Sequence, residues 1–168
     1  MNVIVLETVR TRLRHIKSTD AEFIFNLYND KQFVKNIGYR GINSFQKAEE
    51  YIIENIQGSY KTNGFGIYGV EMKDSGKLAG ICGLVNRPHL DDIDLGYAFM
   101  PKYRGKGLAL ETAKSMKEYA INVLEIEKIV AIVDPNNEPS INLLKKIGMS
   151  FEKMILLPGD TKEICLYS

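Results

Sequence analysis

Hydrophobic and polar residues follow two periods along this chain, and each period predicts a different kind of element. Alternation with a period of two predicts half-buried β-strands, whereas apolar residues three or four apart predict an amphipathic helix. The helical spacing is clearest where Leu108, Thr112, Met116 and Ala120 form one stripe. Strands are predicted over residues 11–16, 65–72, 77–85, 93–100, 128–133, 150–157 and 163–167, and helices over 21–28, 45–56, 108–123 and from Pro139.

Capping and turn residues mark the ends of several of these elements. The polar residues 18–20 supply an N-cap for the first helix, and Asn43 or Ser44 can cap the second. Residues 73–76 have the composition of a turn and join two strands in a hairpin. Gly148 suits the left-handed end of a helix. Paired strands come first and alternating strands and helices follow, so we predict an α/β sandwich around one mixed sheet.

The composition is that of a folded globular protein. Of the 168 residues, 45% are hydrophobic and 26% are charged, which are ordinary values for such proteins. A chain of this length buries enough surface to fold without disulfides or a structural metal. Its apolar stretches are too short to span a bilayer, and residues 1–11 lack the apolar core of a signal peptide. We therefore predict a single domain over residues 1–168 with no membrane partner.

Charge and cysteine content argue against two further classes of protein. The chain has 22 basic and 21 acidic residues, a net charge of +1, whereas nucleic-acid-binding proteins usually present a strongly basic face. Cys82 and Cys165 stand far apart with no C-x-x-C motif, so no metal site is expected. Cys82 lies in the apolar run 78–85, where a free cysteine behaves as a small buried side chain. The prediction is a reduced, cytoplasmic protein that binds no nucleic acid directly.

One glycine pattern is not interpreted as a nucleotide site. Gly64, Gly66 and Gly69 match G-x-G-x-x-G, which binds a dinucleotide when it follows a strand and opens a helix. Here the pattern leads into the strand-like residues 70–72, so no helix N-terminus is available for a pyrophosphate. A bulged or closely packed strand explains these glycines better.

The most informative segment is residues 94–111, where a predicted strand passes through a loop with two glycines straight into a helix. Unpaired N–H groups and the positive end of the helix dipole lie at such a junction, and both favour a bound phosphate. Gly105 and Gly107 would let a phosphate approach the backbone. Positive charge comes from Lys102, Arg104 and Lys106. On these residues alone, the segment is either a phosphate-binding loop or a solvated basic turn whose glycines serve only its dihedral angles.

Two signatures in this chain resemble those of a known superfamily. Residues 104–109, with the sequence Arg-Gly-Lys-Gly-Leu-Ala, match the R-x-x-G-x-G/A signature of the GNAT superfamily of acyl-CoA-dependent N-acetyltransferases. The preceding strand, residues 95–99, resembles the RimJ/RimL-type branch in particular. Residues 137–149 resemble the second signature of that branch, N-x-x-S before a short helix. Residues 11–14 and 80–84 also resemble family positions, so the resemblance covers nearly the whole chain.

The resemblance implies a fold and a cofactor. The fold is a single-domain, three-layer α/β sandwich, with a central mixed, mostly antiparallel sheet and helices on both faces. The cofactor is acetyl-CoA as a co-substrate, with no metal. The CoA pyrophosphate would lie on the N–H groups of the helix that Gly107 opens, and the pantetheine arm on free backbone groups where the strand splays near Phe99. The residues implied in cofactor binding are Phe99, Arg104, Gly105, Lys106, Gly107, Leu108, Ala109 and Asn137.

Acyl transfer to an amine requires that the amine lose a proton, that the oxyanion be stabilised and that the departing thiolate be protonated. Leu144 stands where many members of the family carry a tyrosine as the general acid, which leaves Ser140 as the remaining hydroxyl nearby. The other interpretation of Ser140 is a hydroxyl at a helix start that bonds to the backbone. Asn137 likewise has a second interpretation, an Asx turn after residues 134–135.

Asp94 is the candidate general base. It lies where several members of the family carry an acidic residue that is thought to deprotonate the amine through water. With Asp91 and Asp92 it forms a run of negative charge that would attract a cationic amine. The other interpretation is a solvated charge run at the start of a strand.

The sequence thus predicts a cytoplasmic, acetyl-CoA-dependent N-acetyltransferase that acts as a monomer or homodimer. Transfer would go directly to a primary amine, because no motif offers an activated cysteine nucleophile. The acceptor would be a protein N-terminal α-amine or a small amine such as a polyamine. The alternative is a non-catalytic acyl-CoA-binding or sensing module, which the missing tyrosine at Leu144 favours. A nucleotide-phosphate-binding protein has less support, because the chain lacks a Walker-type motif.

Overall fold

The computed structural model describes residues 2–168. Within them, eight strands form one sheet in the order β1-β2-β3-β4-β5-β6-β8-β7. The strands are β1 (Ile4–Glu7), β2 (Thr11–Arg14), β3 (Ile67–Met72), β4 (Leu78–Val85), β5 (Ile93–Phe99), β6 (Ile129–Val133), β7 (Phe151–Ile155) and β8 (Ile164–Tyr167). Neighbouring strands pair antiparallel except β5 and β6, which run parallel. The predicted mixed, mostly antiparallel sheet is confirmed.

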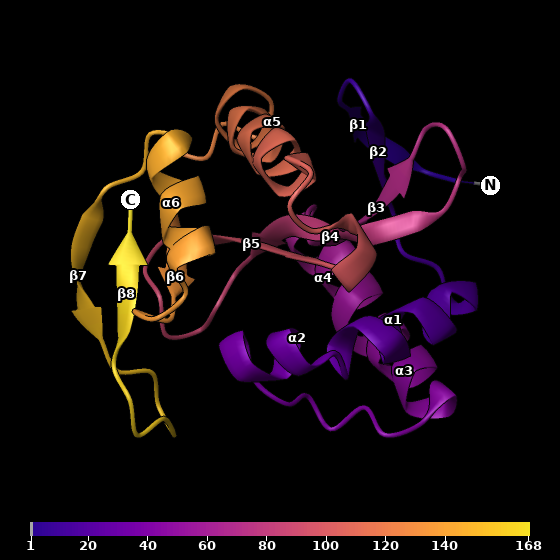
Figure 1. The fold of residues 1–168 in the computed structure, drawn as a ribbon, viewed down its shortest axis with the longest axis horizontal. Coiled ribbons are helices and arrows are strands. Elements are labelled where there is room, and N and C mark those ends of the chain that lie inside the picture. The colour runs from indigo at the N-terminus through magenta and orange to yellow at the C-terminus, as the bar shows by residue number, and fades with distance from the viewer. Residues whose placement is uncertain (1) are drawn as a thin grey trace.

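Helices cover both faces of this sheet (Figure 1). Those on one face are α1 (Ala21–Tyr28), α2 (Lys31–Asn36), α3 (Phe45–Tyr51) and α4 (Gln57–Asn63), and those on the other are α5 (Leu108–Asn122) and α6 (Glu138–Lys146). Each face has its own hydrophobic core. In β4, Ile81 packs with the N-terminal helices, whereas Cys82 and Leu84 pack with α5 and α6. Because alternate residues of a strand point to opposite faces, one strand serves both cores, and the three-layer architecture is confirmed.

Most predicted elements lie where the residue pattern placed them, but the helix that begins at Phe45 is longer than predicted. The pattern ends it at residue 56, whereas α3 continues through the π-helical segment η2 (Ile52–Ile56) into α4. Residues 57–63 are polar and contain a glycine, so they carry no apolar stripe that would indicate a helix. Ser44, not Asn43, is the N-cap, because its hydroxyl accepts a hydrogen bond from the Lys47 N–H at 3.1 Å.

Gly80 of β4 allows the end of β5 to pack directly against its backbone. Gly80 and Phe99 are cross-strand partners. A Cβ on Gly80 would overlap the Ala98 carbonyl oxygen and would lie 2.7 Å from the Phe99 ring. Phe99 is 5% exposed and is the last residue of β5 before the loop that leads into α5. The absence of a side chain at Gly80 therefore sets the position of the strand end on which the candidate site is built.

Replacing Gly80 with alanine is expected to destabilise the fold. The added methyl group must displace the Phe99 ring or the β5 backbone, and such overpacking costs about 1–3 kcal/mol. Urea unfolding monitored by circular dichroism measures the change. Gly58→Ala is the matched control, because a Cβ at Gly58 of α4 meets nothing closer than 4.0 Å and alanine favours a helix. Equal stability of Gly80→Ala and the wild type would show that the contact between β4 and Phe99 is not tight.

Candidate functional site

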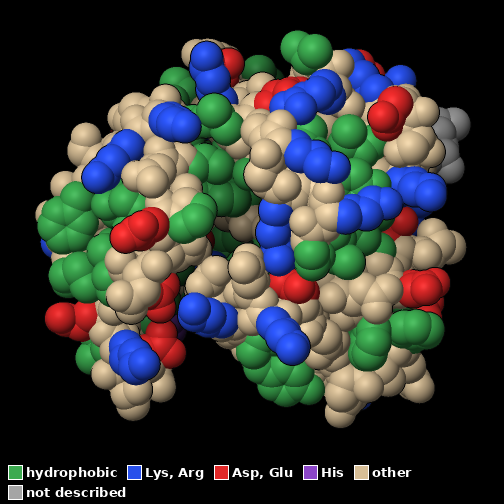
Figure 2. Space-filling model, viewed as in Figure 1, with side chains coloured by type: hydrophobic (Ala, Val, Ile, Leu, Met, Phe, Trp, Pro, Cys, Tyr) green, Lys and Arg blue, Asp and Glu red, His purple; other side chains and the backbone are tan. Residues whose placement is uncertain are grey.

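The pairing of β5 with β6 is short, and the two strands separate beyond it. They pair only at Ile93 with Ile129 and at Asp94 with Val130. Beyond these pairs β5 stays paired with β4 on its other edge, while β6 pairs with β8. Figure 2 shows a hollow over β5, between α6 and the start of α5, with hydrophobic side chains in its walls. The splay expected near Phe99 is therefore present, and it leaves one edge of β5 without a strand partner in the described chain.

Helix α5 begins where β5 ends. The chain leaves β5 through the short helix η3 (Pro101–Tyr103) and reaches Gly107, the N-cap of α5, whose φ of +76° is a left-handed conformation that favours glycine. Leu108 is buried and anchors the first turn in the core. The first N–H groups of a helix have no partner within it, so this 15-residue helix directs donors and the positive end of its dipole outward. The arrangement suits a phosphate.

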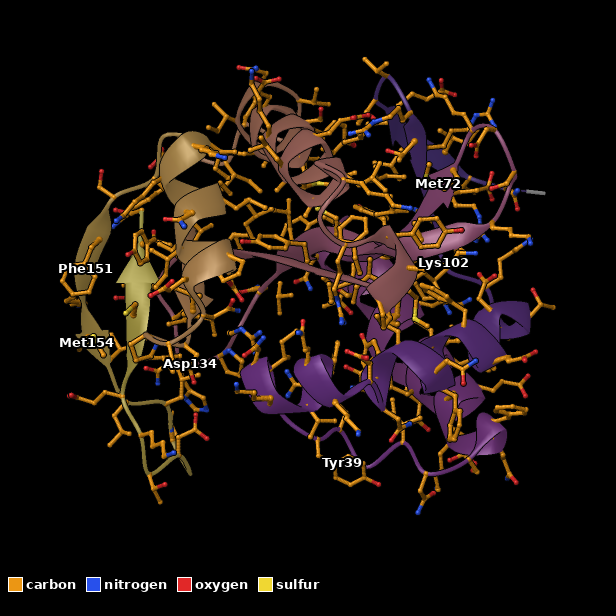
Figure 3. The ribbon with its side chains drawn as sticks, viewed as in Figure 1. Tyr39, Met72, Lys102, Asp134, Phe151 and Met154 are labelled. Atoms are coloured by element: carbon orange, nitrogen blue, oxygen red, sulfur yellow. The ribbon has the colours of Figure 1, made fainter. Side chains whose placement is uncertain are left out.

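Cations surround this helix start, but they do not all face the same way. Lys102 and Lys106 are exposed, with their ammonium groups 4.8 and 6.0 Å from the centroid of the Tyr103 ring (Figure 3 labels Lys102). The guanidinium of Arg104 instead forms an ion pair with Asp30, the N-cap of α2 on the opposite face. The structure thus brings Gly105, Lys106, Gly107, Leu108 and Ala109 together at the start of α5, while the Arg104 side chain reaches toward α2.

Arg10 is a further cation beside this helix start. It lies in the turn between β1 and β2, and its Nε donates to Glu111 Oε2 at 2.7 Å in the first turn of α5. Its Nη1 donates to the Lys106 carbonyl oxygen at 2.9 Å. Sequence reasoning missed Arg10 as a site residue. It lies about a hundred residues away from α5 in the chain, and only the folded sheet brings the two together.

Two hydroxyls meet between β5 and α6, one from each element. The Tyr97 hydroxyl lies 2.6 Å from the Ser140 Oγ, and either oxygen can be the donor. Burial raises the pKa of Tyr97 to about 12, although the hydrogen bond with Ser140 opposes the shift. The Ser140 hydroxyl is therefore bonded to a side chain, in contrast to the interpretation in which it bonds to the backbone. Leu144, one turn further along α6, is 1% exposed and belongs to the core.

Asn137 is the N-cap of α6. Its side-chain oxygen accepts a weak hydrogen bond from the Ser140 N–H at 3.4 Å, and the Asx turn that precedes it is formed by Asp134, whose Oδ1 accepts from the Asn136 N–H. The Asx turn after residues 134–135 is thus present, and Asn137 caps the helix that follows it. The capping bond uses the amide oxygen of Asn137, and the contact of its amide with CoA stays a prediction.

Asp94 is a buried carboxylate at the point where β5 and β6 separate. It is 2% exposed, so it is not part of a solvated charge run, and its Oδ2 accepts from Arg87 Nε at 2.7 Å. Its other oxygen, Oδ1, is buried with no hydrogen-bond partner among residues 2–168. Burial raises the pKa of Asp94 to about 6, although the Arg87 guanidinium and the nearby backbone N–H of Ile132 oppose the shift. A buried carboxylate oxygen without a partner is costly, and this cost marks Asp94 as a candidate for contact with a substrate.

Asp94 and Ser140 lie on opposite faces of the sheet. Along β5, Leu95, Tyr97 and Phe99 pack on the face of α5 and α6, whereas Ala98 packs with the N-terminal helices. Asp94 has the same parity as Ala98 and therefore points to the face of α1 to α4. The two candidate catalytic groups thus approach the gap between β5 and β6 from opposite directions.

In residues 2–168, no group of three or more His, Cys, Asp or Glu side chains is placed to hold a metal ion, and no helix is long and apolar enough to cross a membrane. The pattern that begins at Gly64 opens no helix, because Gly64 ends α4 and the chain then forms β3.

The chain is similar over most of its length to one family of proteins. The acetyltransferase (GNAT) domain family matches residues 10–150, which include β5, the loop into α5 and Asn137. The chain belongs to the GNAT acetyltransferase family. This GNAT protein is an N-acetyltransferase, and members of the family use acyl-CoA as the donor.

Relatives of this GNAT acetyltransferase cover most of its length. The uncharacterized protein YkkB of Bacillus subtilis (strain 168) is 31% identical over 153 residues, which are 89% of this chain and 87% of YkkB. Spermidine N(1)-acetyltransferase of Escherichia coli (strain K12) is 27% identical over 142 residues, 84% of this chain and 73% of the relative.

A solved structure shows the same fold. RimL, the ribosomal L7/L12 alpha-N-protein acetyltransferase solved in complex with coenzyme A, superposes with a TM-score of 0.81 at 14% sequence identity, over 98% of this chain and 96% of that chain. At this identity the likeness shows the fold alone. The GNAT fold and the RimJ/RimL-like resemblance predicted from the sequence are confirmed.

Proposed function

We propose that this GNAT acetyltransferase transfers the acetyl group of acetyl-CoA directly to a primary amine, with no acetyl-enzyme intermediate. The observation that carries the proposal is the position of α5, which begins just after β5 ends. Beyond Asp94, one edge of β5 is unpaired in the described chain. The pantetheine arm would extend along that edge as an additional strand, and the pyrophosphate would accept hydrogen bonds from the first turn of α5. In this proposal Phe99, Gly105, Lys106, Gly107, Leu108, Ala109 and Asn137 form the cofactor-binding set. Arg104 belongs to it through its backbone alone, because its guanidinium is paired with Asp30.

The amine would approach Asp94 from the face of the N-terminal helices. Asp94 Oδ1 has no partner and lies at the end of the short pairing between β5 and β6. With a pKa of about 6 the carboxylate is mostly ionised at neutral pH, so it can accept the ammonium proton. The free amine nitrogen would then attack the thioester carbonyl carbon. A backbone N–H of the unpaired β5 edge would stabilise the oxyanion.

The thiolate of CoA would leave on the opposite face, where the Ser140 and Tyr97 hydroxyls are hydrogen-bonded to each other. As the carbon–sulfur bond breaks, the sulfur takes a proton from this pair or from water. The attacking nitrogen then releases its second proton to the same donor, which restores that donor and leaves a neutral amide and CoA thiol. A free thiol has a pKa of about 8.5, so a thiolate is a good leaving group and needs little assistance from an acid. The proposal therefore does not require a tyrosine at the position of Leu144.

The acceptor is a protein N-terminal α-amine or a small amine such as a polyamine. Relatives and structural neighbours include a spermidine N(1)-acetyltransferase and a ribosomal-protein alpha-N-acetyltransferase, which act on these two classes. The buried, unpaired Asp94 oxygen suits the cationic head common to both classes. As in the sequence-based prediction, we propose a cytoplasmic enzyme that is a monomer or homodimer.

The proposed function is tested by acetyl-CoA turnover with a library of amines. Spermidine and short peptides with free N-termini would be mixed with acetyl-CoA, and release of CoA thiol followed with a colorimetric reagent. Cys82 adds little background, because burial raises its pKa to about 12. Thiol release with one amine class, accompanied by acetylated product in mass spectra, supports the proposal. CoA binding by calorimetry with no turnover on any amine indicates a sensing module, and no CoA binding overturns the proposal.

Ser140→Ala is expected to lower kcat only about tenfold, below the usual effect of removing a general acid. Tyr97 and water remain as proton donors, and the thiolate leaves readily. Because the pKa of Tyr97 is raised to about 12, the rate should show no steep fall near pH 10. Steady-state kinetics from pH 6 to 10.5 check both points. A loss of many orders of magnitude with intact CoA binding would make Ser140 an obligatory acid, and a sharp fall near pH 10 would assign the acid role to a tyrosine with an ordinary pKa.

A further inference from the structure

We infer that two arginines at the start of α5 have different roles. Arg10, outside the family signature, provides the guanidinium that binds the CoA pyrophosphate. Arg104, inside the signature, positions the loop because its side chain is bonded to the start of α2. The inference rests on the proposed function, because it assumes that CoA binds at the start of α5. It assigns a role to a residue in the turn between β1 and β2 and changes the role expected for the Arg104 side chain.

Arg10 is held in place by α5 itself. Its backbone N–H donates to Glu111 Oε1 at 2.8 Å, and its Nε donates to Glu111 Oε2 at 2.7 Å. Thr8 also donates its hydroxyl to Glu111 Oε1, at 2.6 Å. The Glu111 carboxylate thus fixes both ends of the turn that carries Arg10. A guanidinium that is already positioned loses less conformational freedom when a ligand binds.

The free side of this guanidinium faces the helix start. Nη2 lies 3.4 Å from the place that a Cβ on Gly107 would occupy, and Nη1 donates to the Lys106 carbonyl oxygen. Two of the five guanidinium N–H groups are used by Glu111 and Lys106, which leaves three for a ligand. The side chain is 44% exposed. A phosphate on the first turn of α5 would therefore meet the remaining N–H groups of Arg10, and guanidinium groups bind phosphate with paired hydrogen bonds.

The Arg104 side chain is bonded within the protein. Its guanidinium is paired with Asp30 Oδ2, the same oxygen that accepts from the N–H groups of Gln32 and Phe33 at the start of α2. One carboxylate therefore joins the loop between β5 and α5 to a helix on the amine-approach face. Because its charge is satisfied within the protein, Arg104 is a positioning residue whose loss would disturb the geometry between donor and acceptor.

The test compares Arg10→Ala with Arg104→Ala in the full-length protein. By calorimetry, Arg10→Ala should weaken CoA binding about ten- to a hundredfold, the usual effect of removing hydrogen bonds between charged groups. Arg10→Lys should recover little of this loss, because an ammonium lacks the paired geometry. Arg104→Ala should change CoA affinity less than about threefold. It should instead raise the KM of the amine and lower kcat, and Asp30→Asn, which keeps a capping side chain, should do the same.

Two donor analogues separate a ligand contact from a structural effect of Arg10. Acetyl-pantetheine lacks both the pyrophosphate and the adenosine phosphate, so Arg10→Ala should leave its KM unchanged. Dephospho-CoA keeps the pyrophosphate, so the variant should bind it more weakly than the wild type by the same factor as CoA. Wild-type affinity for CoA in Arg10→Ala, or an equal loss with acetyl-pantetheine, would overturn the inference. Failure of the wild type to bind CoA would instead overturn the proposed function.

Discussion

Asp94→Asn is expected to lower kcat by about 100-fold or more while the affinity for acetyl-CoA stays unchanged. Asparagine keeps the shape of the side chain but cannot accept the ammonium proton, and removing a general base usually costs 10²- to 10⁴-fold. CoA affinity should not change, because Phe99 and the loop of residues 104–109 lie at or beyond the other end of β5, and Asp94 points to the opposite face from Phe99. Steady-state kinetics and calorimetry measure the two quantities.

The pH dependence of kcat provides an independent check on Asp94. Since burial raises its pKa to about 6, the carboxylate loses its charge as the pH falls through that value, and wild-type kcat should fall with it. The fall should be absent in Asp94→Asn. Asp92→Asn is the matched control, because Asp92 is less buried and pairs with Lys128 at 3.4 Å. Equal turnover of Asp94→Asn and the wild type near neutral pH would leave Asp94 only a structural role with Arg87.

Gly107→Val is expected to weaken acetyl-CoA binding about 10- to 100-fold. A branched side chain at the N-cap of α5 would stand between the pyrophosphate and the first-turn N–H groups, and hydrogen bonds to a charged group contribute about 1.5–3 kcal/mol each. The left-handed φ of +76° also strains valine, so part of any change could come from folding. A control for that strain is therefore needed.

Gly76→Val supplies the control for strain. Gly76 has a φ of +66°, has open space around the place of a Cβ, and lies in the turn between β3 and β4. Both variants should lose thermal stability, but only Gly107→Val should lose CoA affinity in calorimetry. Unchanged affinity in folded Gly107→Val would remove the pyrophosphate from the start of α5.

The elements predicted correctly are those with a strong period or a clear end. α5 carries an apolar stripe, and its start at Leu108 matches the prediction. β1 (Ile4–Glu7) was not predicted, although the apolar, β-branched run Ile4, Val5 and Leu6 favours a strand by composition. Its residues show no alternation of apolar and polar side chains. α2 is six residues long with Phe33 as its one buried residue, yet Asp30 in front of it is an N-cap that the sequence does display. Short elements held mainly by tertiary contacts escape a period-based prediction.

The candidate site was predictable only where its residues are adjacent in the chain. The loop of residues 104–109 is continuous, so a strand–loop–helix pattern is sufficient to recognise it. The contacts of Arg10 with Glu111 and of Arg104 with Asp30 join residues far apart in sequence. The burial of Asp94 is also a tertiary effect, because Asp91 and Asp92 in the same run are exposed or half-buried. Local patterns therefore predicted the loop of residues 104–109 better than the distant residues that contact it.

The separation of the two hydrophobic cores has a consequence for how such enzymes diversify. Ile24, Leu27, Ile52 and Ile56 of the N-terminal helices pack in one cluster, and Leu108, Met116 and Leu144 of α5 and α6 pack in the other. Tyr60 packs against both clusters. A substitution in the first cluster away from Tyr60 can reshape the proposed amine side with little effect on the packing behind residues 104–109, because distant sites without shared partners act nearly independently. The preference for one amine acceptor can thus change during evolution while the acyl-CoA donor remains the same. That independence would allow one ancestral scaffold to give rise to descendants that acetylate polyamines and others that acetylate proteins.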